Sequence, residues 1–114
     1  MIDVIEEIRT ERDRQINSEG WTCEHDDKHD KGELPSAAAC YAWFAGVSNI
    51  TREVALSMPA SRQCDEAVIL NRLWPWENRW WKPRDRRRDL IRAAALIVAE
   101  IDRIDRQAEK ENDQ

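Results

Sequence analysis

One segment near the C-terminal end constrains the fold of this chain more than any other. Between Arg86 and about Arg106, apolar residues recur at spacings of three and four, the period of one face of an α-helix. They are Leu90, Ala94, Ile97, Ile101 and Ile104, with Ile91, Ala95 and Val98 beside them. Asp85 precedes the segment and has a side chain suited to cap it. The pattern predicts one long helix, followed by a polar tail over 107–114 that frays.

The rest of the chain also favours helices. Three glycines and four prolines in 114 residues leave few tight turns for an all-β fold. A sparse isoleucine stripe predicts a helix over 2–17, and the segment 36–46, apolar nearly all round, predicts a buried central helix after Pro35. A short helix is expected near 62–72. We therefore expect an all-α fold, a small bundle of three to four helices in a single domain over 1–106.

Composition excludes several classes of protein. The chain has no apolar run long enough to span a bilayer, and its first residues lack the basic and apolar regions of a secretory signal. Cys23, Cys40 and Cys64 are an odd number with no CxxC pair, which favours reduced thiols over disulfides or a zinc site. A cytoplasmic protein with no membrane partner is expected.

Charge is distributed in blocks along the chain. Residues 1–34 hold 5 Lys/Arg and 11 Asp/Glu, whereas residues 79–92 hold 7 Lys/Arg and 2 Asp/Glu. The formal net charge is −5, and the cations are concentrated in one short segment, residues 79–92. General nucleic-acid binding needs many cations presented together. This distribution favours a nucleotide, or another small phosphorylated ligand, over a nucleic acid.

The segment 24–30 holds four carboxylates and two imidazoles, and we expect an ordered acidic loop with at most one helical turn. Crowded carboxylates repel one another unless cations neutralise them, so a divalent metal is one interpretation. In a helix, His25 and His29 would share a face suited to a transition metal; in a loop, the acids would suit Mg²⁺ or Mn²⁺. The candidate metal ligands are Glu24, Asp26, Asp27 and Asp30, and the candidate catalytic residues are Glu24, His25, Asp26 and His29. The competing interpretation is a solvated acidic loop in which a histidine caps a helix or packs on Trp21.

Arginines and tryptophans meet at the start of the last helix. Cations are unfavourable at a helix N-terminus, so an anion should offset them, either a bound phosphate or the acidic first third of the chain. The tryptophans of the connection before this helix would stack a nucleotide base, or else close the core. The candidate ligand-binding residues are Trp80, Trp81, Lys82, Arg86, Arg87 and Arg88. A third interpretation makes this segment a homo-oligomer interface. Trp21 and Trp43 are expected in the core.

A series of short motifs spans roughly residues 7–106. It includes EGWT at 19–22, EHDD at 24–27, WPW at 74–76, WWKP at 80–83 and RRDLI at 87–91. In these motifs the chain resembles a family of small proteins from tailed phages and prophages. The resemblance implies an association with proteins that carry MazG-like dATP/dGTP diphosphohydrolase regions, and hence nucleotide metabolism. MazG-type enzymes hold Mg²⁺ with ExxE and ExxD pairs on facing helices, and neither 36–46 nor 86–106 shows that pair in a clean form.

Two functional hypotheses follow. The first is a phage nucleotide-handling protein, concretely a Mg²⁺-dependent nucleoside triphosphate pyrophosphohydrolase in the cytosol of the host cell. The second is a non-enzymatic accessory or counter-defence protein that binds a nucleotide or a host protein through its Trp/Arg surface.

Overall fold

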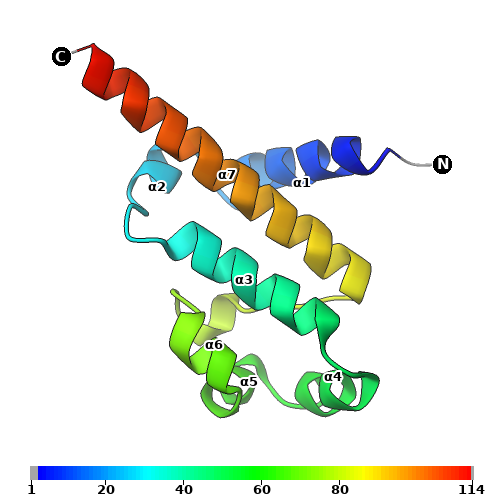
Figure 1. The fold of residues 1–114 in the computed structure, drawn as a ribbon. Helices are drawn as coiled ribbons and strands as arrows, with labels where there is room; N and C mark the ends of the chain where they lie inside the picture. Colours follow the sequence, from blue (N-terminus) through cyan, green and yellow to red (C-terminus); the bar gives the residue numbers. More distant parts are fainter. Residues whose placement is uncertain (1–2, 114) are drawn as a thin grey trace.

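The computed structural model describes residues 3–113, and these residues form helices and no strand, so the prediction of an all-α fold is confirmed (Figure 1). The helices are α1 (Val4–Ser18), α2 (Cys23–Asp27), α3 (Glu33–Gly46), α4 (Asn49–Leu56), α5 (Ala60–Glu66), α6 (Val68–Leu73), the 3₁₀ turn η1 (Asn78–Trp80) and α7 (Arg86–Asn112). The seven α-helices of the described part exceed the expected three to four, because several are only one or two turns long.

Helices α1 and α7 begin at a capping side chain, whereas α3 begins after Gly32, which has none. Asp85 accepts a hydrogen bond from the backbone N–H of Arg88 at 2.8 Å, and Asp3 caps α1 in the same way. Helix α7 continues past its predicted end at Arg106 to Asn112, and Figure 1 shows it projecting beyond the other helices at its C-terminal end.

Helix α3 is the buried centre that the sequence predicts, and it packs along α7, which also packs against α1. Small residues on the facing sides, such as Ala37 and Ala95, allow the two helices to approach closely. Larger side chains complete this core; they are Leu34, Tyr41, Phe44, Leu70, Trp81 and Leu96.

The stretch between α3 and the tryptophan-rich segment consists of short helices. The single helix expected near 62–72 is divided, because the backbone of Ala67 is extended (φ −84°, ψ 118°) and separates α5 from α6. These two helices pack on each other, and α6 also contacts α3. Among residues 3–113, no helix combines the length and the apolar character that crossing a membrane requires.

Candidate functional site

The acidic segment folds into α2 and the turn after it, and two of its carboxylates are occupied by arginines. Asp26 is fully buried and forms an ion pair with Arg12 of α1, which is itself nearly buried. Asp27 accepts hydrogen bonds from Arg106 of α7 at 2.8 Å, and this hydrogen bond lowers the pKa of the Asp27 carboxyl. The segment is therefore tied to α1 and to α7 through its acids.

These contacts bear directly on the predicted Mg²⁺ or Mn²⁺ site. Of the four expected ligands, Asp26 and Asp27 point to arginines, whereas Glu24 and Asp30 are exposed. Within residues 3–113, no three His, Cys, Asp or Glu side chains lie close enough together to share a metal ion. The donor set expected from the sequence does not fit a common metal site in this arrangement.

The arginines at the start of α7 also have partners within the chain. Arg87 donates to both carboxylate oxygens of Glu7, at 2.6 and 2.8 Å, and Arg88 pairs with the buried Glu11. Of the two anions expected to offset these arginines, a bound phosphate or the acidic first third of the chain, the structure contains the second. Arg86 instead donates to the backbone carbonyls of Ala45 and Val47, at 2.7 and 2.6 Å, where they leave the end of α3.

Glu11 is the centre of this network. Its side chain is 1% exposed, and the guanidinium of Arg14 donates to it at 2.8 Å. Burial raises the pKa of Glu11, but the hydrogen bond from Arg14 and the charges of Arg88 and Arg92 outweigh burial and hold that pKa below its ordinary value. Three predicted phosphate ligands, Arg86, Arg87 and Arg88, are thus engaged in holding helices together.

The neighbouring tryptophans of the WWKP motif have different environments. Trp81 is 1% exposed, and its indole N–H donates to Gln63 at 2.9 Å, so it belongs to the core rather than to a binding surface. Trp80 is 49% exposed, and the ammonium of Lys82 lies 5.2 Å from the centroid of its ring. Of the predicted ligand-binding set, Trp80 and Lys82 keep an accessible face.

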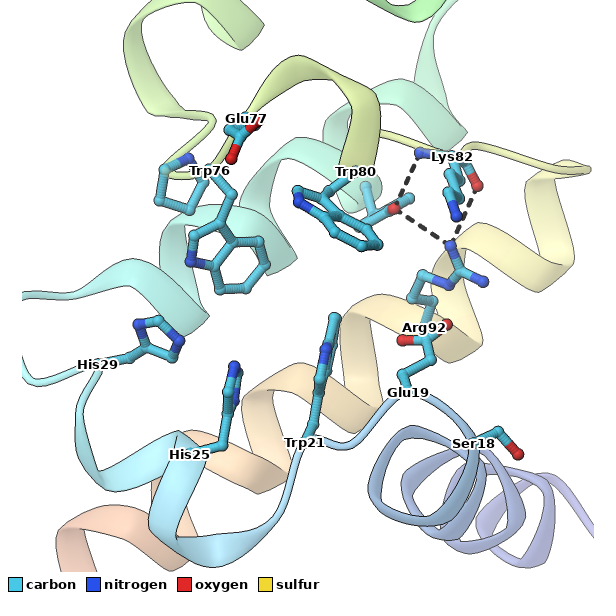
Figure 2. Close-up of a pocket in the computed structure, with 12 residues that line it drawn as sticks. Ser18, Glu19, Trp21, His25, His29, Trp76, Glu77, Trp80, Lys82 and Arg92 are labelled. Atoms are coloured by element: carbon cyan, nitrogen blue, oxygen red, sulfur yellow. Dashed lines mark hydrogen bonds between the residues drawn. The ribbon is translucent and has the colours of Figure 1, made fainter.

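Trp80 and Lys82 line an open cavity of about 760 Å³. Figure 2 shows Trp76 and Trp80 on one side of this pocket and Trp21, His25 and His29 on the other. The first two belong to the segment before α7, and the others to α2 and the turns that flank it. Trp21 and Trp43, expected in the core, are half-buried and pack against it, and Trp21 also lines the pocket. We call this cavity the aromatic pocket.

The rings of the aromatic pocket contact one another in a closed series. Trp21 and His25 are stacked, with ring planes 5° apart and centroids at 6.3 Å. The His25 and His29 rings follow at 4.7 Å, His29 and Trp76 at 5.4 Å, and Trp76 and Trp21 at 5.6 Å. The i,i+4 spacing of the two histidines, noted as a metal-binding pattern, here places their rings side by side in an aromatic wall.

A polar clamp fixes the segment that carries Trp80 and Lys82. Arg92 of α7 donates to the hydroxyl of Tyr41 at 3.2 Å and to the carbonyl of Lys82 at 3.1 Å (Figure 2). The backbone N–H of Lys82 donates to the same hydroxyl at 3.3 Å. Burial raises the pKa of Tyr41, so the hydroxyl remains protonated at neutral pH.

The charges around the pocket are unevenly paired. Glu19 and Glu77 line the cavity, but each has an arginine partner, Arg14 at 2.9 Å and Arg79 at 3.3 Å. The ammonium of Lys82 forms no ion pair with any residue between 3 and 113, and its contact is the Trp80 ring. The unbalanced charge of the aromatic pocket is therefore positive.

The histidines differ in their hydrogen bonds. His29 Nδ1 lies 3.1 Å from Glu33, while His25 Nδ1 is buried 3.6 Å from the carboxylate of Asp26 and has no hydrogen-bond partner among the described residues. Trp76 Nε1 is also buried and has no hydrogen-bond partner among the described residues. Of the predicted catalytic residues, the structure thus brings His25 and His29 to the pocket, while Glu24 lies on the surface and Asp26 faces Arg12.

Sequence reasoning missed Tyr41 and Arg92 as pocket residues. Tyr41 lies in the middle of an apolar helix and Arg92 inside the α7 repeat, so their local patterns indicate only helix. One signal was present: an arginine on the apolar side of an amphipathic helix needs a buried partner.

No family model, curated protein or solved structure matches this chain.

Proposed function

We propose that this protein binds a nucleotide in the aromatic pocket and acts by holding it, without hydrolysis. One observation carries the proposal: an open cavity of about 760 Å³ is walled by indole rings and has at its edge the ammonium of Lys82, which forms no ion pair with residues 3–113. That volume lies in the range of small-molecule sites, roughly 300–1,000 Å³. A flat aromatic group with a negative charge complements this combination.

The half-exposed ring of Trp80, which the cations of Arg79 and Lys82 approach at 5.0 and 5.2 Å from its centroid, and the opposing Trp21 supply the stacking surfaces. Indole rings bind bases through stacking and apolar area, with little dependence on which base is present. Lys82 lies next to Trp80, so a base against that ring would place its phosphates within reach of the ammonium. The clamp from Arg92 and Tyr41 holds this segment in place before a ligand arrives, which reduces the entropy lost on binding.

The contacts of the acidic segment favour binding over hydrolysis. A metal-dependent pyrophosphohydrolase needs several carboxylates free to hold the metal on the triphosphate. Asp26 and Asp27 instead neutralise Arg12 and Arg106. The resemblance to small tailed-phage proteins supports the nucleotide class and an accessory or counter-defence role in the host cytosol.

The test is a titration of the four dNTPs, with and without Mg²⁺ or Mn²⁺, that follows tryptophan fluorescence and pyrophosphate release in the same samples. We expect saturable quenching without release, and weaker quenching for Lys82→Ala. Lys28→Ala, which removes an exposed lysine that does not line the pocket, is the matched control and should bind as the wild type does. Metal-dependent pyrophosphate release would overturn the non-enzymatic proposal in favour of the hydrolase. No response to any dNTP would overturn nucleotide binding.

A further inference from the structure

Helix α7 has two apolar faces, and the protein covers one of them. Ala95, Leu96 and Ala99 are fully or almost fully buried in the core. The other face is open to solvent along most of the helix. Its exposed side chains are Leu90 at 52%, Ile97 at 48%, Ile101 at 52% and Ile104 at 50%. Isolated exposed apolar residues are ordinary, but a continuous row on one helix marks a contact surface.

The spacing of the exposed row is that of a helix-pairing seam. Leu90, Ala94, Ile97, Ile101, Ile104 and Ala108 alternate between steps of four and three residues, as the a and d positions of a heptad do. A sequence with this alternation packs its side chains between those of a second helix that has the same alternation. The seam lies within one uninterrupted helix of 27 residues, which is long enough for such packing.

The ends of the seam carry opposite charges. Continuing the alternation by one step leads to Arg87 before Leu90 and to Glu111 after Ala108. A parallel pair of α7 helices would set Arg87 against Arg87 and Glu111 against Glu111. An antiparallel pair would set Arg87 of one copy against Glu111 of the other, at both ends. Arg87 also pairs with Glu7 of its own chain, and that pair leaves its side chain 60% exposed.

The sizes of the seam residues agree with the antiparallel register. Matching the two charged ends places Leu90 opposite Ala108 and Ala94 opposite Ile104, so large side chains meet small ones, while Ile97 meets Ile101 at the centre. A surface that is complementary to itself in the reverse direction is what a two-fold dimer requires. The row therefore selects a second copy of this chain as its partner.

We propose that the protein forms a two-fold dimer in which α7 pairs with α7 of a second copy, antiparallel, along the seam from Arg87 to Glu111. Arg92 lies on the buried face of the same helix, so the seam and the aromatic pocket are separate surfaces. The dimer does not depend on the proposed nucleotide binding.

Sedimentation velocity of the full chain over a series of concentrations tests the dimer. We expect a species of twice the chain mass of 13.4 kDa, and Ile101→Arg should convert it to monomer. Ile50→Arg is the matched control, because Ile50 is exposed to 75% but lies on α4, and it should leave the dimer intact. Circular dichroism establishes that both variants keep their helices. A wild type that stays monomeric, a dimer insensitive to Ile101→Arg, or an assembly larger than two would overturn the proposal.

Charge exchange tests the orientation. Glu111→Arg should weaken the dimer by about tenfold, because it sets two arginines together at each end of the seam. Glu109→Arg, an equal change on an exposed residue outside the alternation, should weaken it less. The double variant Arg87→Glu with Glu111→Arg restores opposite charges only in the antiparallel arrangement. Arg87→Glu alone is measured beside it, because that substitution also removes the ion pair with Glu7. A double variant as weak as Glu111→Arg alone would overturn that arrangement.

Discussion

The ion-pair network between α1, α2 and α7 and the aromatic pocket both contain charged side chains, yet only the pocket is open. In the network, Asp26 meets Arg12 and Glu11 meets Arg88, with both carboxylates fully or almost fully buried. In the pocket, Lys82 has no counter-ion among residues 3–113, and Trp80 keeps half its surface in solvent. Clusters of charge along a chain can thus satisfy one another, and a binding site is found where a charge is left over.

The two regions should also differ in how a substitution changes the free energy of unfolding. Burying a charged pair adds little net stability, but removing one partner leaves a charge without compensation in the interior. Substitutions in the network should therefore act on folding, whereas substitutions in the pocket should act on binding.

The largest effect is expected at Asp26. Asp26→Ala should lower the free energy of unfolding by about 3–5 kcal/mol, because it leaves the guanidinium of Arg12 buried without its counter-ion. Urea denaturation measures the loss. Asp30→Ala, at an exposed acid of the same segment, should change stability by no more than about 0.5 kcal/mol. Equal effects of the two substitutions would show that Asp26 is not part of a structural pair.

A matched pair of tryptophan substitutions comes next. Trp81→Phe should cost about 1–3 kcal/mol of unfolding free energy, because it leaves the buried amide oxygen of Gln63 without a donor. Trp80→Phe should leave stability nearly unchanged, since Trp80 is half exposed. Thermal unfolding of the two variants side by side measures the difference. A Trp80→Phe variant as unstable as Trp81→Phe would assign both rings to the core.

When ligand binding is measured, the cation of the pocket should contribute to affinity and the cation of the network should not. Lys82→Gln should weaken dATP binding by about tenfold, the loss of one charge-assisted contact. Arg87→Gln should leave the affinity unchanged, because Arg87 already pairs with Glu7. Calorimetric titration of both variants gives the comparison. A larger loss for Arg87→Gln would return the phosphate site to the start of α7.

The smallest effect near neutral pH comes from the carboxylates of the network. The pKa values of Glu11 and Asp27 are lowered in the folded protein, so the stability from these groups is present above their unfolded pKa values and is lost as the pH falls through the folded ones. Burial raises the pKa of Asp89, and that group acts in the opposite direction.

The expected net result is a fall in stability below about pH 4.5, the ordinary pKa of a glutamate. Urea unfolding at a series of pH values measures it. Glu11→Gln should make the acid-side slope shallower, because one of the groups that bind protons on unfolding is gone. A slope equal to that of the wild type would mean that Glu11 does not contribute.

The sequence predicted the fold where local patterns decide it. The 3–4 spacing from Leu90 predicts α7, and the apolar run after Pro35 predicts α3. Both are local patterns, because the order of the residues alone defines an apolar helix face or a buried helix. The division at Ala67 was not predicted, since it depends on how α5 and α6 pack rather than on a proline or glycine.

The site was predicted in part for the same reason. Trp80, Lys82, His25 and His29 were selected by residue type and do line the pocket. Which charges are free could not be predicted, because Arg12 and Asp26 meet only in the folded chain. The neighbours Trp80 and Trp81 look alike in sequence, and only the packing around each separates them.

The central claim is that the aromatic pocket, and not the arginine run or the core, receives the ligand. Titrating dATP into ¹⁵N-labelled protein and following the indole N–H signals tests it directly, because the six tryptophans report on different regions. We expect concentration-dependent shifts for Trp21, Trp76 and Trp80, with Trp43 and Trp81 unmoved. Shifts confined to Trp43 and Trp81, or no shift at saturating dATP, would contradict it.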